Sequence, residues 1–231
     1  MIRVLILTFL SFLSQVSFGQ QNYFQVWAET GVTGKINNKF EYAVDWNNRF
    51  GNYYLQTIFG QASVKYKFKK WLKPSIDYRF ISSRSNNSNY SSNHRLNFNL
   101  QFSKAVKRLE LDLRLRYQYS FSSVISGTYE PDFDKAVRFK PAISYDINNF
   151  PLTPHISAEV FYDPSNYELG NRFTKVRYSA SLSLDMKGPH KVEFGYILDQ
   201  RIQLNSSLNR HILSLNYTYQ IKKKTKGKKK K

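Results

Sequence analysis

The sequence contains no cysteine among its 231 residues. This absence excludes disulfide bonds, zinc–thiolate centres and a catalytic thiol nucleophile. Long apolar runs are also missing, because no stretch reaches the eighteen or so apolar residues of a transmembrane helix. The mean hydropathy of −0.53 would suit a soluble protein. It also suits a membrane β-barrel, in which every second residue faces a polar lumen.

The first nineteen residues have the layout of a secretory signal peptide. Arg3 gives a positive start, an apolar run follows from Val4 to Leu13, and small residues stand at Ser17 and Gly19. The apolar run is too short to span a bilayer as an uncleaved anchor. We therefore predict that residues 1–19 are a signal peptide, with cleavage before Gln20, and that the protein is exported.

After this segment the chain alternates between apolar and polar residues. The clearest case is 109–121, where every odd position from Leu109 to Phe121 is Leu, Tyr or Phe and every even position is polar or charged. A period of two over thirteen residues predicts a β-strand. Strands in soluble sheets average five or six residues, whereas a tilted strand crossing a bilayer needs roughly nine to eleven. The length therefore points to a transmembrane strand.

The same pattern recurs along the whole chain. Counting the segment at Leu109, eleven alternating segments begin near Phe24, Phe40, Ile58, Leu72, Leu96, Leu109, Val137, Ile156, Val176, Val192 and His211. Their apolar faces carry essentially no charge between the strand ends, and Tyr, Phe and Trp concentrate toward those ends, as at membrane interfaces. A secreted β-sandwich would show the same alternation, but not strands of this length.

The connections fall into two classes. Short ones lie near 34–38, 69–70, 105–107, 148–152 and 187–189, and mostly longer ones near 50–53, 82–93, 122–132, 163–171 and 203–209. Outer-membrane barrels have short periplasmic turns, long external loops and, in bacteria, an even number of strands. We therefore predict an all-β fold at 20–221, an antiparallel transmembrane β-barrel of twelve strands, with ten as the second choice. The eleven visible segments conflict with both numbers.

Alternation places many charged side chains on the inward face, in a lumen narrow enough for them to meet. A candidate lumen charge network consists of Glu29, Asp77, Arg79, Arg95, Glu110, Asp112, Arg114, Arg116, Glu159, Arg177, Glu193 and Arg201. The same face also carries Glu41, Asp45, Lys65, Arg138, Lys140, Lys175, Asp199 and Arg210. Because interior charges are usually paired, we predict that they fill the lumen in a structural or surface-contact protein. The alternative is a narrow, weakly anion-selective channel lined by arginine.

Catalysis has little support in the sequence. Barrel lipid hydrolases use Ser, His and a carboxylate or amide on the wall, and only four histidines occur here. His94 follows Ser91 and Ser92. Because Ser and Asn are abundant in that region, the closeness of His94 to these serines is little evidence for a catalytic pair. No spacing of His, Asp or Glu suggests a metal site. We predict no enzyme, no cofactor and no metal, with a lipid hydrolase as the exception to test.

The chain ends in a polybasic tail at 222–231, composed of Lys222, Lys223, Lys224, Lys226, Lys228, Lys229, Lys230 and Lys231 with one Thr and one Gly. Like charges repel and nothing in the tail can be buried, so we predict disorder. It supplies eight of the net +19 charges. Nucleic acid is excluded as a partner by export and by the lack of any known motif. Beside a membrane the tail would attract anionic lipid or another periplasmic polyanion, or else remain a passive terminus.

Several short motifs, in order, resemble an uncharacterised outer-membrane family of Bacteroidota, domain of unknown function 2490 (DUF2490). They are Trp27-Ala28-Glu29, Gly34-Lys35, Lys39-Phe40, Tyr78-Arg79-Phe80, Asn93-His94-Arg95, Arg114-Leu115-Arg116-Tyr117-Gln118, the stretch from Pro154 to Tyr162, and His211-Ile212-Leu213 with Leu215 and Tyr217. The resemblance implies an outer-membrane barrel with no assigned activity. The final strand, with Tyr217 and Tyr219, also resembles the signal read by the barrel assembly machinery, but continues into the lysine tail. The implied partners are that machinery and outer-membrane lipid.

Overall fold

The computed structural model describes residues 21–51, 54–84, 90–122, 135–164, 173–186, 188–202 and 208–221. In this part of the chain there are eleven strands and no helix: β1 (Gln21–Lys35), β2 (Phe40–Gly51), β3 (Tyr54–Tyr66), β4 (Leu72–Arg84), β5 (Tyr90–Val106), β6 (Leu109–Ser122), β7 (Lys135–Tyr145), β8 (Leu152–Tyr162), β9 (Phe173–Asp185), β10 (His190–Arg201) and β11 (Leu208–Ile221). The predicted signal peptide and polybasic tail lie outside the described residues.

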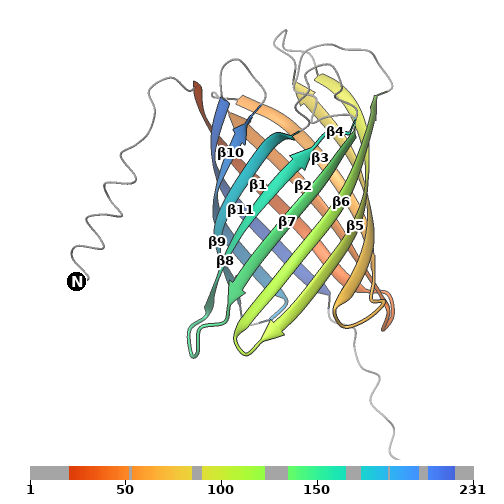
Figure 1. The fold of residues 1–231 in the computed structure, drawn as a ribbon, viewed down its shortest axis with the longest axis vertical. Coiled ribbons are helices and arrows are strands. Elements are labelled where there is room, and N and C mark those ends of the chain that lie inside the picture. Colours follow the sequence, from red (N-terminus) through yellow and green to blue (C-terminus); the bar gives the residue numbers. More distant parts are fainter. Residues whose placement is uncertain are drawn as a thin grey trace, which may run out of the picture.

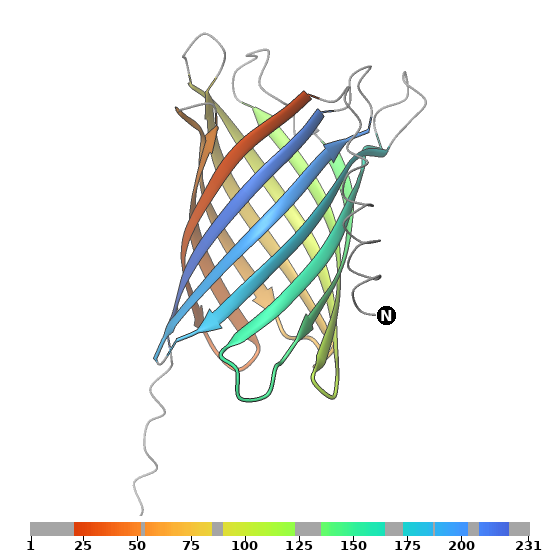
Figure 2. The same cartoon turned by 90° about the vertical axis from the view of Figure 1, so that its left-hand side faces the viewer.

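All eleven strands form one closed, tilted barrel (Figures 1 and 2). Each strand pairs antiparallel with its neighbours in sequence, so the wall is an up-and-down meander. The barrel closes where β1 pairs with β11 in parallel, in one unbroken register from Gln21↔Leu208 to Gly34↔Ile221. The strand lengths, from eleven residues in β7 to seventeen in β5, agree with the long alternating segments.

The strand number corrects the prediction of twelve strands, and also the second choice of ten. An odd meander forces its first and last strands to run in the same direction, and the barrel accommodates this with one parallel pair, making the sheet mixed. A parallel ladder has evenly spaced, slanted hydrogen bonds and is only slightly less stable per residue. The even-number rule therefore describes where chain ends usually lie and does not limit strand pairing.

The two ends of the barrel differ. Residues 36–39, 67–71, 107–108, 146–151 and 186–189 connect strands at one end, here called the turn end; the other end is the loop end. Lys107 and Asn149 turn the chain tightly with a φ of 56°. Because β1 and β11 are parallel, β1 begins at the loop end and β11 finishes at the turn end. The predicted loop at 82–93 is shorter than expected, since β4 and β5 remain paired as far as Arg84↔Tyr90.

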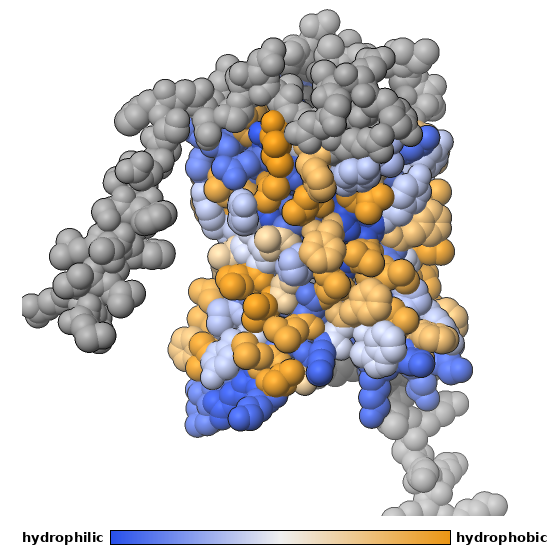
Figure 3. Space-filling model, in the orientation of Figure 1, coloured by the Kyte–Doolittle hydropathy of each residue, from blue (hydrophilic) through white to orange (hydrophobic). Residues whose placement is uncertain are grey.

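Apolar side chains cover the outside of the wall, and polar side chains face inward. Val44, Ile156 and Phe194 are each more than half exposed, whereas Asp77, Glu159 and Asp199 are almost completely buried. Figure 3 shows apolar residues spread over the wall, with hydrophilic residues gathered at the turn end. The described residues contain no helix that is long and apolar enough to cross a membrane. The few buried apolar residues, including Phe59, Phe161 and Ile212, lie inside the barrel.

Candidate functional site

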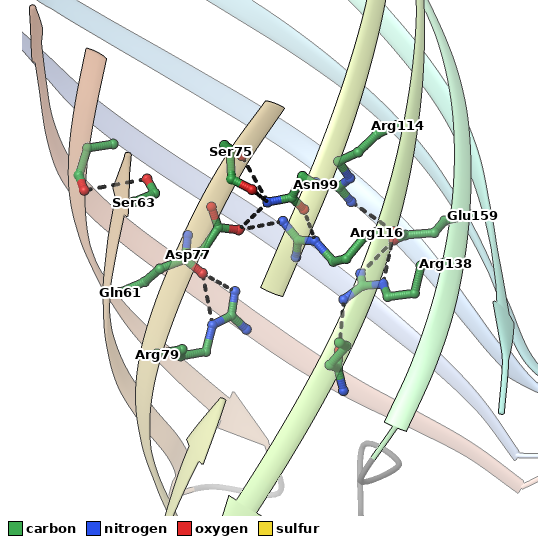
Figure 4. A network of polar contacts seen from close by, with 12 residues as sticks. Gln61, Ser63, Ser75, Asp77, Arg79, Asn99, Arg114, Arg116, Arg138 and Glu159 are labelled. Carbon is green, nitrogen blue, oxygen red and sulfur yellow. Dashed lines mark hydrogen bonds and ion pairs between the residues drawn. The ribbon is translucent and has the colours of Figure 1, made fainter. Parts of the chain in front are cut away.

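From the middle of the barrel toward the loop end, charged inward side chains form three clusters, two of which share Arg177. The Asp77 cluster lies on β4, β5 and β6, where alternation turns Asp77, Asn99 and Arg116 inward (Figure 4). Asp77 Oδ2 accepts hydrogen bonds from Arg116 Nη2 and Asn99 Nδ2, both at 2.9 Å. Asn99 also donates to Ser75 Oγ and accepts from Arg116 Nε. The carboxylate is thus held by both of its neighbours.

The Glu159 cluster joins β6, β7, β8 and β9. Glu159 receives a two-pronged contact from Arg138, with Nε to Oε1 at 3.0 Å and Nη2 to Oε2 at 2.8 Å. Arg114 Nη2 donates to Oε1 at 2.8 Å, and Arg177 Nη1 lies 4.0 Å from Oε2. Bidentate contact between arginine and a carboxylate is strong and directional. One buried carboxylate on β8 therefore orders side chains from three other strands.

The Asp199 cluster continues this arrangement across β9, β10 and β11. Asp199 Oδ2 lies 2.9 Å from Arg177 Nη2, 3.5 Å from Arg210 Nη2 and 3.7 Å from Lys175 Nζ. Lys175 and Asp199 have only 2% and 1% of their surface exposed. Arg177 touches both carboxylates, so the Glu159 and Asp199 clusters form one network.

Aromatic rings fill the space between these cations. Phe161 lies 4.3 Å from the cationic groups of both Arg138 and Lys175. On the opposite wall, Phe59 lies 4.0 Å from Arg79 and 4.9 Å from Arg49. Arg79 also donates two hydrogen bonds to Gln61 Oε1. A cation over an aromatic face is stabilised most when water is excluded. These contacts make the loop-end half of the lumen a packed interior.

The turn-end half has several small inward side chains between longer ones such as Glu41 and Lys65. Its wall carries Ala43, Ser63, Ala142, Ser144, Ser157, Ser179, Ser181 and Gly195. A hollow of about 620 Å³ opens there, lined by residues that include Thr33, Ala43, Ser63 and Gln220. The lumen is therefore filled toward the loops and open toward the turns.

The structure brings together part of the predicted charge network. Asp77, Arg114, Arg116, Glu159 and Arg177 belong to the three clusters. The other predicted members lie elsewhere: Glu29 bonds Asn47, Arg79 bonds Gln61, Arg95 bonds Ser120, Asp112 bonds Gln101 and Ser103, Glu110 is exposed at the turn end, Glu193 is half-buried, and Arg201 ends β10.

Four cluster members were placed on the inward face by alternation but not in the predicted network: Arg138, Lys175, Asp199 and Arg210. The inward rings of Trp27, Phe59 and Phe161 were not expected in a lumen of polar or small partners. The sequence did contain a signal for these three rings. Each stands on the inward set of its alternating segment, because successive side chains of a strand point to opposite faces.

Three of the four histidines lie on the outer wall, each bonded to a tyrosine diagonally across a strand pair. The contacts are Tyr78 with His94, Tyr217 with His190 and Tyr196 with His211, at 2.7, 2.7 and 2.6 Å. His94 also stacks on Phe121, so its ring is engaged by aromatic neighbours and not by Ser91 or Ser92. Within the described ranges, no group of three or more His, Asp or Glu side chains could hold a metal ion.

The family model described as "Protein of unknown function (DUF2490)" matches residues 24–211, which span β1 to the start of β11. No curated protein matches the chain.

Proposed function

Because the chain belongs to the DUF2490 family of proteins of unknown function, whose model covers most of its length, we propose a function from the geometry of the barrel. The protein is an integral outer-membrane β-barrel whose lumen is closed by its own side chains. Its role is structural or in surface contact, and it is neither a transporter nor an enzyme.

The inverted distribution of polarity carries this proposal. The outer wall exposes large apolar residues on every strand, while almost all charged side chains between the strand ends point inward. In water such a wall would be a very large exposed apolar surface, which monomeric soluble proteins avoid. In a bilayer the same wall is solvated by lipid tails, and the closed sheet leaves no strand edge unpaired. The fold is therefore suited to lipid.

Aromatic side chains at both strand ends support a bilayer position between them. At the turn end Phe40 packs on Tyr66 with ring centroids 4.9 Å apart, and Trp71 stacks on Phe102. Basic residues accompany them in the short turns, namely Lys39, Lys67, Lys69, Lys70, Lys107 and Arg108. At the loop end Phe50, Phe80 and Phe121 are exposed. Two aromatic girdles around an apolar band are typical of outer-membrane barrels, with the short turns in the periplasm.

The test of membrane integration is heat modifiability. A closed barrel stays folded in mild detergent until it is heated, so an unheated sample should migrate faster on a gel than a boiled one. After expression with its own N-terminal segment, the protein should be found in the outer-membrane fraction. Recovery of the mature protein as a stable monomer without detergent would refute the proposal.

A narrow, weakly anion-selective channel is the second candidate. The observation that favours it is the arginine content of the lumen, since arginine rings attract anions. The observation that disfavours it is the packing of Phe161, Lys175 and Asp199, which are each at most 3% exposed. A water-filled path through the loop-end half would require these side chains to move. Single-channel conductance separates the two candidates.

The polybasic tail at 222–231 is proposed to bind anionic lipid or another periplasmic polyanion. The support is that Ile221, the last residue of β11, lies at the turn end beside the basic turns. Each lysine near an anionic membrane contributes about 1 kcal/mol, screened by salt. Removing residues 222–231 should leave heat modifiability unchanged and weaken binding to vesicles rich in anionic lipid. Equal binding with and without the tail at low salt would make it a passive terminus.

A further inference from the structure

Arg114 and Lys140 are direct cross-strand partners on β6 and β7, and both point into the lumen. Like charges placed directly opposite each other on a sheet are destabilising. Such a local conflict persists where the surrounding structure or a ligand offsets it, and these conflicts concentrate at functional sites. This pair lies where the filled half of the lumen meets the hollow half.

Lys140 lacks a partner in the structure. Within the described part of the chain, no hydrogen-bond acceptor or carboxylate lies within bonding distance of its ammonium group. Glu159 is within electrostatic range of Lys140, but its oxygens already accept from Arg114 and Arg138. Asp112, the next inward residue of β6, accepts from Gln101 and Ser103 on β5 instead. The half-buried lysine is left without a bonded counter-charge.

Arg114 offers a second unused donor at the same place. Its Nη2 binds Glu159, but its buried Nε–H has no hydrogen-bond partner in the described structure. An unsatisfied buried donor is costly and calls for an acceptor. The Arg114 side chain as a whole is 27% exposed, so a bound anion would meet the guanidinium group, and the buried Nε–H would become available through a shift of that group.

The strand pairing is interrupted next to this pair. Pairing between β7 and β8 is interrupted at Lys140 and Pro141, and resumes at Ala142↔Ser157 without a change of register. Proline lacks the N–H that a ladder needs. Toward the turn end the adjoining inward residues are small, namely Ala142, Ser157 and Ser179. These small neighbours leave the two cations without a large side chain beside them on the turn-end side.

We propose that Lys140 and Arg114 form a binding site for a soluble phosphate or phosphate ester that enters the lumen through the turn-end hollow. Lysine supplies a point charge and arginine a directional N–H donor, a combination suited to phosphate oxygens. His155, on β8 and within electrostatic range of Lys140, lies on the same approach. The inference rests on the inward geometry of the barrel and does not require a membrane location.

The test is calorimetric titration of the full-length barrel in detergent with inorganic phosphate, at about 0.15 M chloride to screen exposed lysines. One phosphate should bind per barrel, and acetate should bind more weakly. Lys140→Met should weaken phosphate binding about tenfold or more, as expected for loss of a charge-assisted contact. Lys140→Arg should retain it. Lys73→Met, which removes an inward lysine near the turn end of β4, is the matched control and should leave the affinity unchanged.

Three results would overturn the proposal. They are no phosphate binding by the wild-type barrel, equal loss in Lys140→Met and Lys73→Met, and competition by phosphatidylglycerol added to the micelles, which would identify a lipid headgroup as the ligand. Each variant must show the wild-type heat shift on a gel, and Lys140→Arg keeps the test decisive if Lys140→Met does not fold. The two proposals can fail separately. If the barrel does not integrate into a membrane, the gel and the fractionation show it, whereas the titration reports only on phosphate binding.

Discussion

The two halves of the lumen are enclosed by the same eleven strands and the same apolar outer wall, yet they differ in what fills them. Toward the loops, Arg138 and Lys175 pack against Phe161, and Asp199 is buried beside Lys175. Toward the turns, small inward residues such as Ala43, Ser63 and Ser181 stand among charged ones such as Glu41 and Lys65, and a hollow remains. The comparison shows that the volume of inward side chains, and not the strand number, determines whether this barrel is closed or open at a given height.

The largest difference between the halves should appear when one carboxylate is neutralised. Glu159→Gln removes the charge that holds Arg114 and Arg138 in a buried site, and breaking a buried pair costs about 3–5 kcal/mol. Asp112→Asn in the turn-end half should cost less than about 1 kcal/mol, because Asp112 is half-exposed and bonded to neutral groups. Urea unfolding of both variants in lipid vesicles measures the two values. Equal losses would mean that the halves are equally packed.

A matched pair of enlargements should give the next largest difference. Ala136 is fully buried in the loop-end half, so Ala136→Leu should destabilise the barrel by about 1–3 kcal/mol through overpacking. Ala43 lines the hollow, so Ala43→Leu has room and should change stability by less than about 0.5 kcal/mol. The same unfolding assay compares them. A larger loss in Ala43→Leu would show that the hollow is occupied.

The smallest change in stability is expected at Asn97, one of two inward asparagines that stand two residues apart on β5. Asn99 bonds Asp77, Ser75 and Arg116, so Asn99→Leu should cost about 2 kcal/mol. Asn97 is completely buried, and its amide has no hydrogen-bond partner among the described residues. Asn97→Leu should therefore be neutral or slightly stabilising. A clear destabilisation would indicate that an ordered water or ligand satisfies the amide.

Much of the fold could be predicted from the sequence, because alternation fixes which face each residue occupies. The thirteen residues of 109–121 lie in β6 as expected, and all eleven alternating segments are strands. Strand direction at the closure could not be predicted, since a period of two is the same for parallel and antiparallel neighbours. The sequence showed eleven alternating segments, but the rule that bacterial barrels have an even number of strands led to the wrong prediction of twelve.

The candidate site could be predicted only as a set of inward charges. Alternation gives the face of Glu159, Arg138 and Asp199 but not their height, which depends on the stagger between neighbouring strands. That stagger places Arg177 between Glu159 and Asp199 and leaves Glu110 at the turn end. The rings of Phe59 and Phe161 were missed because a polar lumen was expected, although arginine stacks readily on aromatic faces.

The central claim is that the loop-end half closes the lumen, and conductance across a planar bilayer tests it most directly. The wild-type barrel should show no steady conductance, since Phe161, Lys175 and Asp199 are each at most 3% exposed. Replacing both Arg138 and Phe161 with Ala should produce measurable openings, while Ala at both Ser157 and Ser179 in the turn-end half should not. A large, stable conductance of the wild-type protein would contradict the account and make the barrel a pore.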